Sequence, residues 1–355
     1  MSVQNLTVGI DYHLHSLRVS VLSPEGRELG NASIENDVEK FIRYVSGFGG
    51  SVRGVAIEAC EGSARFADEV IRRANWRVEL CHPGYAQRMR HNPDKTDCHD
   101  AYLMADLSRV GYLPKVWLAP EDLRDLRTLV RYRASVSAQA KEQKQRIRSI
   151  LRRERIKLPP GYKTLWSQKA RLWLESFAEL PEHTLWVFKR HLAQLKSFEE
   201  ELKESEKRLT EFAERDPLIT ELMKQPGIGV ITATILRAEI GTFTRFMTGK
   251  EFARFCGLTP KNASSGQRQA DAGLVKAGNP ILKTALIQVG HNLCRYHPDY
   301  RERARRMLSA GKKKGVVIAA MTNRWARRFF YLMRDFETRG SESVLTAADS
   351  STMTH

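Results

Sequence analysis

Residues 6–13, LTVGIDYH, combine a short apolar run with an acidic residue at its end. The apolar run predicts a buried strand, and Asp11 then lies where that strand ends. Residues 54–60, GVAIEAC, repeat the pattern, with Glu58 after the apolar run. A carboxylate at the end of a buried strand is displayed at the rim of its sheet. These two stretches therefore predict a sheet and an acidic side chain at the end of each of two strands.

Further strands and helices are expected around these two stretches. Alternating or continuous apolar runs predict strands at Leu6–Ile10, Arg18–Leu22, Glu28–Ile34, Val52–Ile57 and Val78–Cys81. Helical spacing predicts helices at Asp37–Val45, through Phe66 and Val70, and at Asp97–Val110. Three strands, a helix and then further strand–helix units predict an α/β domain over residues 1–117, with a mixed sheet covered by helices.

Residues 118–215 have a different pattern, in which apolar residues recur at steps of three, four or seven. Two long helices separated by Pro159-Pro160-Gly161 predict an antiparallel coiled-coil arm. Residues 120–158 contain 12 Lys or Arg and 5 Asp or Glu. That excess suits a helix that follows a nucleic-acid backbone, although a solvated spacer or a dimerisation arm is an equal alternative.

The whole chain is strongly basic, with 58 Lys and Arg against 41 Asp and Glu and a net charge of +17. Such an excess indicates a polyanionic partner, and nucleic acid is the commonest one; a basic surface that binds nothing is the alternative. Five scattered cysteines, with no CxxC pair, indicate reduced thiols in a cytosol and no zinc site. We expect no membrane partner, because the sequence has no signal-peptide pattern and no run of about 18 apolar residues.

Two further acids, Asp97 and Asp100, occur in residues 95–101, KTDCHDA, at the start of a predicted helix. They are three residues apart, so they share one face of that helix. Four converging carboxylates repel one another unless cations bind, and Mg²⁺ or Mn²⁺ prefers such oxygen donors. Two such ions about 3.5–4 Å apart polarise a phosphodiester. Each acid alone has a plainer explanation: Asp11 a turn, Glu58 the surface, Asp97 and Asp100 the first turn of a helix.

With these residues in order, the first 115 residues resemble the RNase H/RuvC-like domain of the DEDD transposases of prokaryotic insertion sequences. That family carries Asp, Glu, Asp and Asp, the last two in a T-D-x-x-D element, which is Thr96 to Asp100 here. The resemblance implies that the metal-binding and catalytic carboxylates are Asp11, Glu58, Asp97 and Asp100. Lys95 precedes the element as in the family, and we expect it to contact nucleic acid.

Residues 216–336 predict an all-α domain with glycine-rich turns. Pro226-Gly227-Ile228-Gly229, followed by an apolar helix, resembles a helix-hairpin-helix turn. Gly227 and Gly229 let the backbone approach a phosphate, and the helix start offers free N–H donors; a simple loop between packed helices is the alternative. Residues 337–355 are polar and predict a disordered tail.

Residues 252–286, FARFCGLTPKNASSGQRQADAGLVKAGNPILKTAL, resemble the C-terminal domain of the same transposases. The family uses the serine before the Ser-Gly glycine as a nucleophile on DNA, which implies Ser265, although the neighbouring Ser264 leaves the register open. Arg268 and Lys276 are candidate nucleic-acid contacts, in a segment that is less basic than in the family. A turn serine bonded to its own backbone is the plainer explanation.

Lys312, Lys313 and Lys314 form a basic cluster just before an apolar helix. The helix dipole disfavours cations at that end, and a bound phosphate would offset the penalty. A solvated loop is an equal alternative.

The resemblance implies a DNA transposase or recombinase in the prokaryotic cytoplasm, at the nucleoid. It implies cutting and rejoining through a covalent serine–DNA intermediate, with double-stranded DNA, a non-coding bridge RNA that acts as a guide, and further copies of the chain (dimer or tetramer) as partners. Two alternatives stand beside it. One is a metal-dependent nuclease or junction resolvase in which Ser265 is structural; the other is a non-catalytic nucleic-acid-binding protein.

Overall fold

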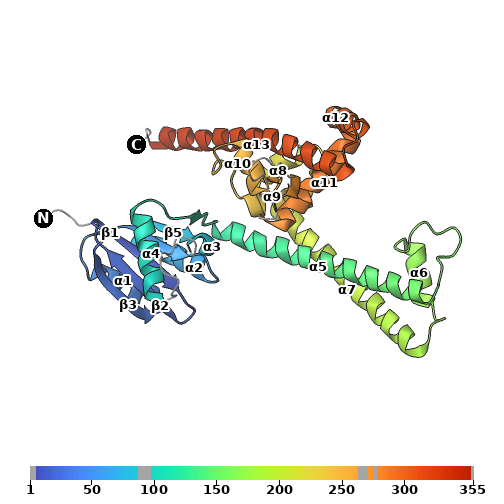
Figure 1. Ribbon diagram of the computed structural model, residues 1–355, viewed down its shortest axis with the longest axis horizontal. Helices are drawn as coiled ribbons and strands as arrows, with labels where there is room; N and C mark the ends of the chain where they lie inside the picture. The colour runs from blue at the N-terminus through green and yellow to red at the C-terminus, as the bar shows by residue number, and fades with distance from the viewer. Residues whose placement is uncertain (1–4, 87–96, 263–270, 276–277, 353–355) are drawn as a thin grey trace. The chain divides into compact units, whose positions relative to one another are not determined.

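The structure is a computed structural model, and it describes residues 5–86, 97–262, 271–275 and 278–352 (Figure 1). The chain divides into two compact units, residues 1–119 and residues 120–355. Each unit has its own hydrophobic core, so each is described by itself.

The N-terminal unit contains a mixed sheet of six strands among its described residues, in the order β3-β2-β1-β4-β5-β6. The strands are β1 (Asn5–Tyr12), β2 (Ser16–Leu22), β3 (Glu28–Glu35), β4 (Ser51–Glu58), β5 (Val78–Cys81) and β6 (Lys115–Val116). β1 pairs antiparallel with β2 and parallel with β4, β5 lies parallel to β4, and the two edge strands β3 and β6 are antiparallel to their neighbours. All five strands predicted from the sequence are confirmed, and β6 is an addition too short to show a periodic pattern.

Helices cover both faces of this sheet. The helices of this unit are α1 (Val38–Ser46), α2 (Ser63–Ala74), α3 (Pro83–Ala86) and α4 (Asp97–Arg109). Leu6, Val8 and Ile10 of β1 pack into one core with the apolar residues of α1 and α2. Side chains alternate along a strand, so Gly9 and Asp11 belong to the opposite face, against which α4 packs. The arrangement is the mixed α/β sheet expected of an RNase H-like domain.

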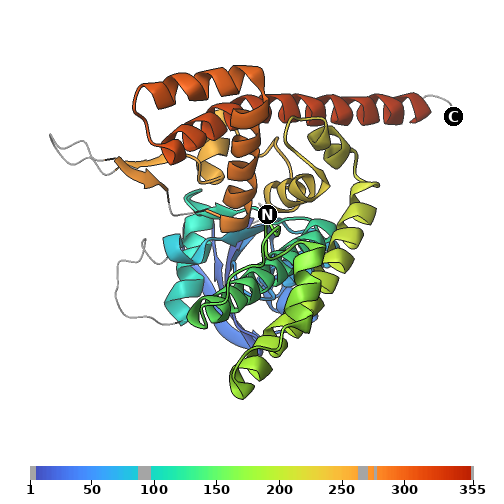
Figure 2. The ribbon, with the colours of Figure 1, turned by 90° about the vertical axis from the view of Figure 1, so that its right-hand side faces the viewer.

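The second unit begins with two long helices, α5 (Glu121–Arg153) and α7 (Glu182–Ala213), which lie side by side in Figures 1 and 2. They run antiparallel, since Arg133 pairs with Glu206, whereas Lys144, further along α5, pairs with Glu199, further back along α7. Between them lies α6 (Gln168–Ser176), which the sequence did not predict. Ser167 caps its first turn, because its hydroxyl accepts a hydrogen bond from the backbone N–H of Ala170.

The rest of the second unit is a helical body with a small two-stranded sheet (Figure 2). The helices are α8 (Pro217–Met223), α9 (Val230–Ile240), α10 (Gly249–Phe255), α11 (Pro280–Tyr296), α12 (Pro298–Ser309) and α13 (Lys314–Thr352), and the strands are β7 (Pro260–Asn262) and β8 (Asp271–Leu274). Its core includes a group of aromatic rings contributed by Phe243, Phe252, Phe329 and Phe330. This confirms the helical C-terminal region.

The end of the chain differs from the disordered tail predicted for residues 337–355, because α13 continues to Thr352. Glu337 anchors this stretch by accepting hydrogen bonds from the hydroxyl of Thr242, at 2.8 Å, and the backbone N–H of Phe243, at 2.7 Å. These partners lie more than 90 residues earlier in the chain, so local composition does not reveal them.

Within the described part of the chain, no helix is both long and apolar enough to cross a membrane.

Candidate metal centre

Two of the predicted carboxylates lie at the ends of neighbouring parallel strands, at the same rim of the N-terminal sheet. Ile10 of β1 is in register with Ile57 of β4, so Asp11 and Glu58 each lie one residue beyond a paired position. Ala56 packs on the α4 side with Met104, and Glu58, two residues further along β4, belongs to that same side. Both acids therefore belong to the sheet face that α4 covers.

The other two carboxylates occupy the first turn of α4. Asp100 is buried, whereas the side chain of Asp97 is 58% exposed. Their three-residue spacing places both on one side of the helix. α4 packs closely on β1 at Gly9, where the missing side chain leaves room for the helix backbone. This close packing brings the first turn of α4 to the rim where β1 ends.

Asp11 and Asp97 meet at His13, which lies just after β1. The distance from Nε2 of His13 to Oδ2 of Asp11 is 3.2 Å, and to Oδ2 of Asp97 it is 3.5 Å. One ligand atom of each residue lies within 4.8 Å of the other two. Glu58 and Asp100 do not belong to this closest group of described residues, although they lie on the neighbouring strand and on the same helix.

The Asp11 carboxylate is buried and lies close to other acidic side chains. Burial raises the pKa of Asp11, and the nearby charges of Asp97 and Asp100 raise it further, while His13 opposes the shift. Burial and like charge both disfavour the ionised carboxylate, and a divalent cation relieves both. Carboxylate oxygens are the donors that Mg²⁺ and Mn²⁺ prefer, so these side chains fit such an ion.

Two cysteines beside the rim connect Glu58 to the same electrostatic environment. Burial raises the pKa of Cys60, and the charges of Glu58 and Asp11 add to that shift. Burial, followed by the charge of Glu58, raises the pKa of Cys81 to about 11. Because Glu58 and Asp11 both act on Cys60, negative charge from the two strand ends is concentrated around one small region.

His13 is the residue of this group that sequence reasoning missed. The available signal was its spacing in Asp11-Tyr12-His13, because residues two apart on extended backbone point to the same side. A turn closed by a hydrogen bond from the His13 backbone N–H to the Ser16 carbonyl holds the residue at the end of β1.

Comparison with known protein families matches both units of the chain. Residues 8–155 match the family DEDD_Tnp_IS110, described as a transposase. Residues 219–305 match Transposase_20, described as the transposase IS116/IS110/IS902 family. The chain belongs to the IS110 family of transposases. Its N-terminal DEDD domain implies metal-dependent catalysis, and a transposase binds DNA.

Several curated relatives of this transposase cover much of its length. A probable family 20 transposase of Pseudomonas aeruginosa is 25% identical over 290 residues, which is 79% of this chain and 83% of that protein. The transposase for insertion sequence element IS1533 of Leptospira borgpetersenii is 25% identical, with the same two shares of 79% and 83%. The transposase for IS1328 of Yersinia enterocolitica is 24% identical over 66% of this chain and 69% of that protein.

The glycine turn predicted in the second half of the transposase joins α8 to α9. Gly227 has a φ of +83°, in the left-handed region that favours glycine, and a side chain there would lie 3.2 Å from Cβ of Asn292 in α11. Gly229 is the N-cap of α9, and a side chain there would meet nothing within 4 Å. The turn thus packs on α11 on one side, as a plain loop would, and leaves open space at the other.

The remaining predicted residues fall into two groups. Lys312, Lys313 and Lys314 are exposed, and Lys314 is the first residue of α13. Five predicted residues lie outside the described residues: Lys95, Ser264, Ser265, Arg268 and Lys276. In sequence, the two serines fall between β7 and β8, which pair antiparallel through Pro260–Leu274 and Asn262–Asp271.

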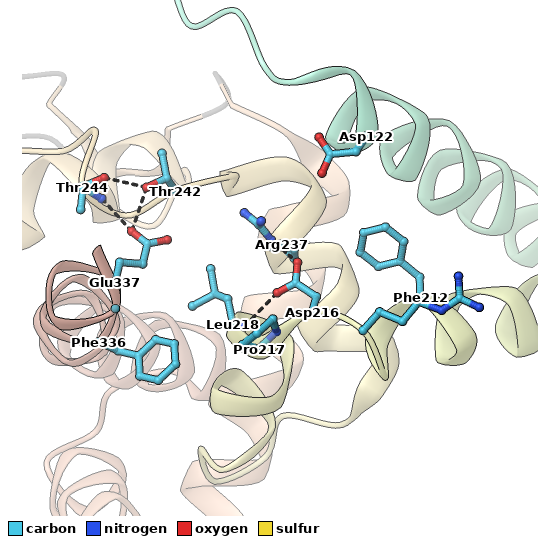
Figure 3. A pocket seen from close by; sticks show the side chains of 12 residues that line it. Asp122, Phe212, Asp216, Pro217, Leu218, Arg237, Thr242, Thr244, Phe336 and Glu337 are labelled. Atoms are coloured by element: carbon cyan, nitrogen blue, oxygen red, sulfur yellow. Dashed lines mark hydrogen bonds and ion pairs between the residues drawn. The ribbon is translucent and has the colours of Figure 1, made fainter. Parts of the chain in front are cut away.

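A pocket of about 970 Å³ in the second unit contains none of the residues predicted from the sequence (Figure 3). Glu337 lies on one side of it, bonded to Thr242 and to the backbone N–H of Thr244. Arg237 and Asp216 lie on the other side and form an ion pair at 2.6 Å. The bonds from Glu337 connect α13 to the loop that follows α9.

Proposed function

We propose that this transposase cuts and rejoins DNA with Mg²⁺ or Mn²⁺ held by Asp11, Glu58, Asp97 and Asp100, and with Ser265 as the nucleophile. The observation that carries the metal part is the meeting of Asp11 and Asp97, from separate elements, at a rim where a second strand ends in Glu58. The serine part rests on the family resemblance of residues 252–286.

The side chains of the rim have distinct tasks in this proposal. Asp11 and Asp97 offer carboxylate oxygens within 4.8 Å of each other, and His13 contacts both and orients them. Asp100 is buried and adds negative charge beside Asp11, which strengthens the binding of a cation. When bound, the divalent ion supplies positive charge that lowers the barrier to breaking a phosphodiester.

The serine step exchanges one phosphoester bond for another. The hydroxyl oxygen of Ser265 forms a bond to phosphorus while the bond from phosphorus to a sugar oxygen breaks. The serine proton passes to a base or to solvent, and the sugar oxygen leaves as a hydroxyl after taking up a proton. Attack by a sugar hydroxyl on the serine phosphodiester reverses the step, so strands rejoin without an added energy source.

We further propose that a non-coding bridge RNA guides the reaction and that several copies of the chain act together. The high net charge and the basic helix α5 support binding of a second nucleic acid. The antiparallel pair α5–α7 supports a coiled-coil arm spanning residues 118–215. RNA that co-purifies and maps beside the gene tests the first proposal, and light scattering of the purified protein tests for a dimer or tetramer.

The decisive experiment follows protein–DNA adducts that resist denaturation. Asp11→Asn and Ser265→Ala should both abolish the adduct, and chelation of divalent ions should do the same to the wild type. Ser264→Ala, which changes the neighbouring serine, should preserve it. Asp106→Asn is the matched carboxylate control, because Asp106 lies on α4 but pairs with Arg109.

Each alternative function has its own outcome in this experiment. Ser265→Ala protein that still cuts DNA in a metal-dependent way would indicate a nuclease or resolvase. Asp11→Asn protein with every activity intact would indicate a nucleic-acid-binding protein without metal catalysis. Loss of the adduct in Ser264→Ala, with retention in Ser265→Ala, would assign the nucleophile to Ser264.

A further inference from the structure

A basic groove lies in the second unit between α11, α12 and α13, with a volume of about 630 Å³. Its permanent cations are Arg295, Arg301, Arg305 and Lys314, and His291 also lines it. None of the side chains that line the basic groove is an Asp or a Glu. The groove thus gathers positive charge from three separate helices.

The local structure explains why these cations converge. Arg301 and Arg305 are four residues apart, so they lie on one side of α12. Tyr300 and Ala304 are buried and hold α12 against the hydrophobic core. A turn at Gly311, with a φ of +77°, then reverses the chain into α13. Convergence is therefore built into the packing of the helices and does not depend on mobile side chains alone.

The charges of the basic groove are poorly compensated compared with those elsewhere in the unit. Arg133, for example, lies 2.6 Å from Glu206. On α12 the acid that forms ion pairs is Glu302, which lies 2.9 Å from Arg306, a residue outside the groove, and 3.9 Å from Arg305. Its single charge faces three arginines, since it also interacts with Arg301. Among the described ion pairs, none joins Arg295, Arg301 or Lys314 to a carboxylate. Like charges held together in this way favour an anionic ligand.

The charge pattern continues beyond the groove. Residues 295–314 contain eight Lys or Arg and two acids, and Lys312 and Lys313 are exposed beside Lys314. A single small anion needs one or two donors, whereas a chain of evenly spaced phosphates matches a surface of this extent.

We propose that the basic groove binds the phosphodiester backbone of nucleic acid and that Arg301 and Arg305 each contact a phosphate. The inference rests on the binding of DNA by transposases of this family. It does not require that the four carboxylates or Ser265 be catalytic. Duplex DNA and folded RNA both have a phosphodiester backbone. The experiment therefore tests one probe of each kind.

The test measures how binding depends on salt, in EDTA so that no strand is cut. The groove variant Arg301→Gln/Arg305→Gln is compared with Arg303→Gln/Arg306→Gln, which removes the same charge from the same helix outside the groove. The probes are a labelled random-sequence DNA duplex and a labelled RNA hairpin of unrelated sequence. Titrations between about 50 and 200 mM KCl give the slope of log K against log salt.

The groove variant should bind about tenfold more weakly, and its slope should be shallower by about two for the nucleic acid that occupies the groove. The control variant should stay close to the wild type. A change with DNA alone, RNA alone or both identifies the source of the backbone. Circular dichroism melts of both variants establish that each is folded.

The proposal is overturned if the two variants have equal slopes with both probes, or if the wild type binds neither. It is also overturned if inorganic phosphate or pyrophosphate binds the wild type but the groove variant retains the polymer slope. Binding in EDTA needs no bond to be cut, so it reports on the basic groove and not on the proposed catalytic carboxylates or Ser265. Failure of this proposal and failure of the proposed catalytic residues therefore give different results.

Discussion

The backbone of Ala101 in α4 lies where a side chain on Gly9 of β1 would be. A Cβ atom at residue 9 would be 2.0 Å from the carbonyl oxygen of Ala101 and 2.5 Å from the backbone nitrogen of Ala105. Contacts this short do not occur, so α4 lies this close to the sheet only because residue 9 is glycine. The first turn of α4 carries Asp97, so Gly9 positions one half of the candidate metal centre.

Gly9→Ala should displace α4 and destabilise the N-terminal unit by about 1–3 kcal/mol, the usual cost of inserting atoms into a packed core. Hydrogen exchange of the amides in β1 and α4 should accelerate, and binding of Mn²⁺ should weaken because Asp97 moves. Gly54→Ala on the neighbouring strand is the matched control. Its Cβ would meet its nearest atoms at 3.7 and 3.9 Å, which is ordinary contact. Equal exchange rates in the two variants would show that α4 adapts without cost.

Asp11→Asn should stabilise the protein in EDTA while it weakens divalent-ion binding. Burial and neighbouring carboxylates raise the pKa of Asp11, so the folded state holds its charge at a cost that a neutral side chain avoids. The melting temperature of the variant in EDTA should equal or exceed that of the wild type. Added Mg²⁺ should raise the melting temperature of the wild type more, because the ion binds the folded site. A variant that melts lower in EDTA and gains as much from Mg²⁺ would argue against a cation site at Asp11.

The sequence predicted much of the N-terminal unit because its signals there are local. The strands β1 and β4 are continuous apolar runs, and the acid that ends each run marks the rim directly. The start of α4 followed from two acids three residues apart. What brings these elements together is the parallel pairing of β1 with β4 and the packing of α4 at Gly9, which only the folded chain shows.

The features that sequence reasoning missed depend on distant partners. His13 joins the site because a turn places it between Asp11 and Asp97, and its spacing from Asp11 does not reveal the contact with Asp97. The short helix α6 buries Leu174 beside Phe188 of α7 but leaves Leu172 61% exposed, so its apolar periodicity is weak. The segment with Ser265 lies outside the described residues, so its role stays a prediction.

Glu337→Gln should change how stability depends on pH. Burial raises the pKa of Glu337 above the ordinary value of 4.5. At pH values between 4.5 and the raised pKa of the folded state, the folded protein binds the proton more tightly than the unfolded protein does. The free energy of unfolding of the wild type therefore falls as pH rises through that range. Glutamine removes this fall, so the free energy of unfolding of the variant relative to the wild type should increase as pH rises above 4.5. Urea unfolding at each pH measures this difference, and hydrogen exchange of the α13 amides shows whether the change lies in that helix.

Glu302→Gln is the control for that experiment, because the side chain of Arg306 lowers the pKa of Glu302. A lowered pKa stabilises the folded state at pH values above the unfolded value of 4.5. The free energy of unfolding of Glu302→Gln relative to the wild type should therefore fall as pH rises toward 4.5 and stay level at higher pH. If the two variants follow the same trend, burial of Glu337 is not the cause.

Arg131→Ala should be far more costly than Arg133→Ala, although both arginines lie on α5. Two nitrogens of Arg131 lie 3.0 Å from the two carboxylate oxygens of Glu239 on α9, and the Glu239 side chain is only 4% exposed. Without Arg131 the buried carboxylate keeps, among the described ion pairs, the one with Arg127 at 4.0 Å, so the loss should be about 3 kcal/mol. Arg133 pairs with Glu206, which is 40% exposed, so its removal should cost less than about 1 kcal/mol because water replaces the arginine. The double variant Arg131→Ala/Glu239→Gln should recover much of the loss, since no uncompensated charge remains.

Urea unfolding of the three variants measures the loss in the free energy of unfolding. Equal losses for Arg131→Ala and Arg133→Ala would mean that the buried charge does not hold α5 to α9.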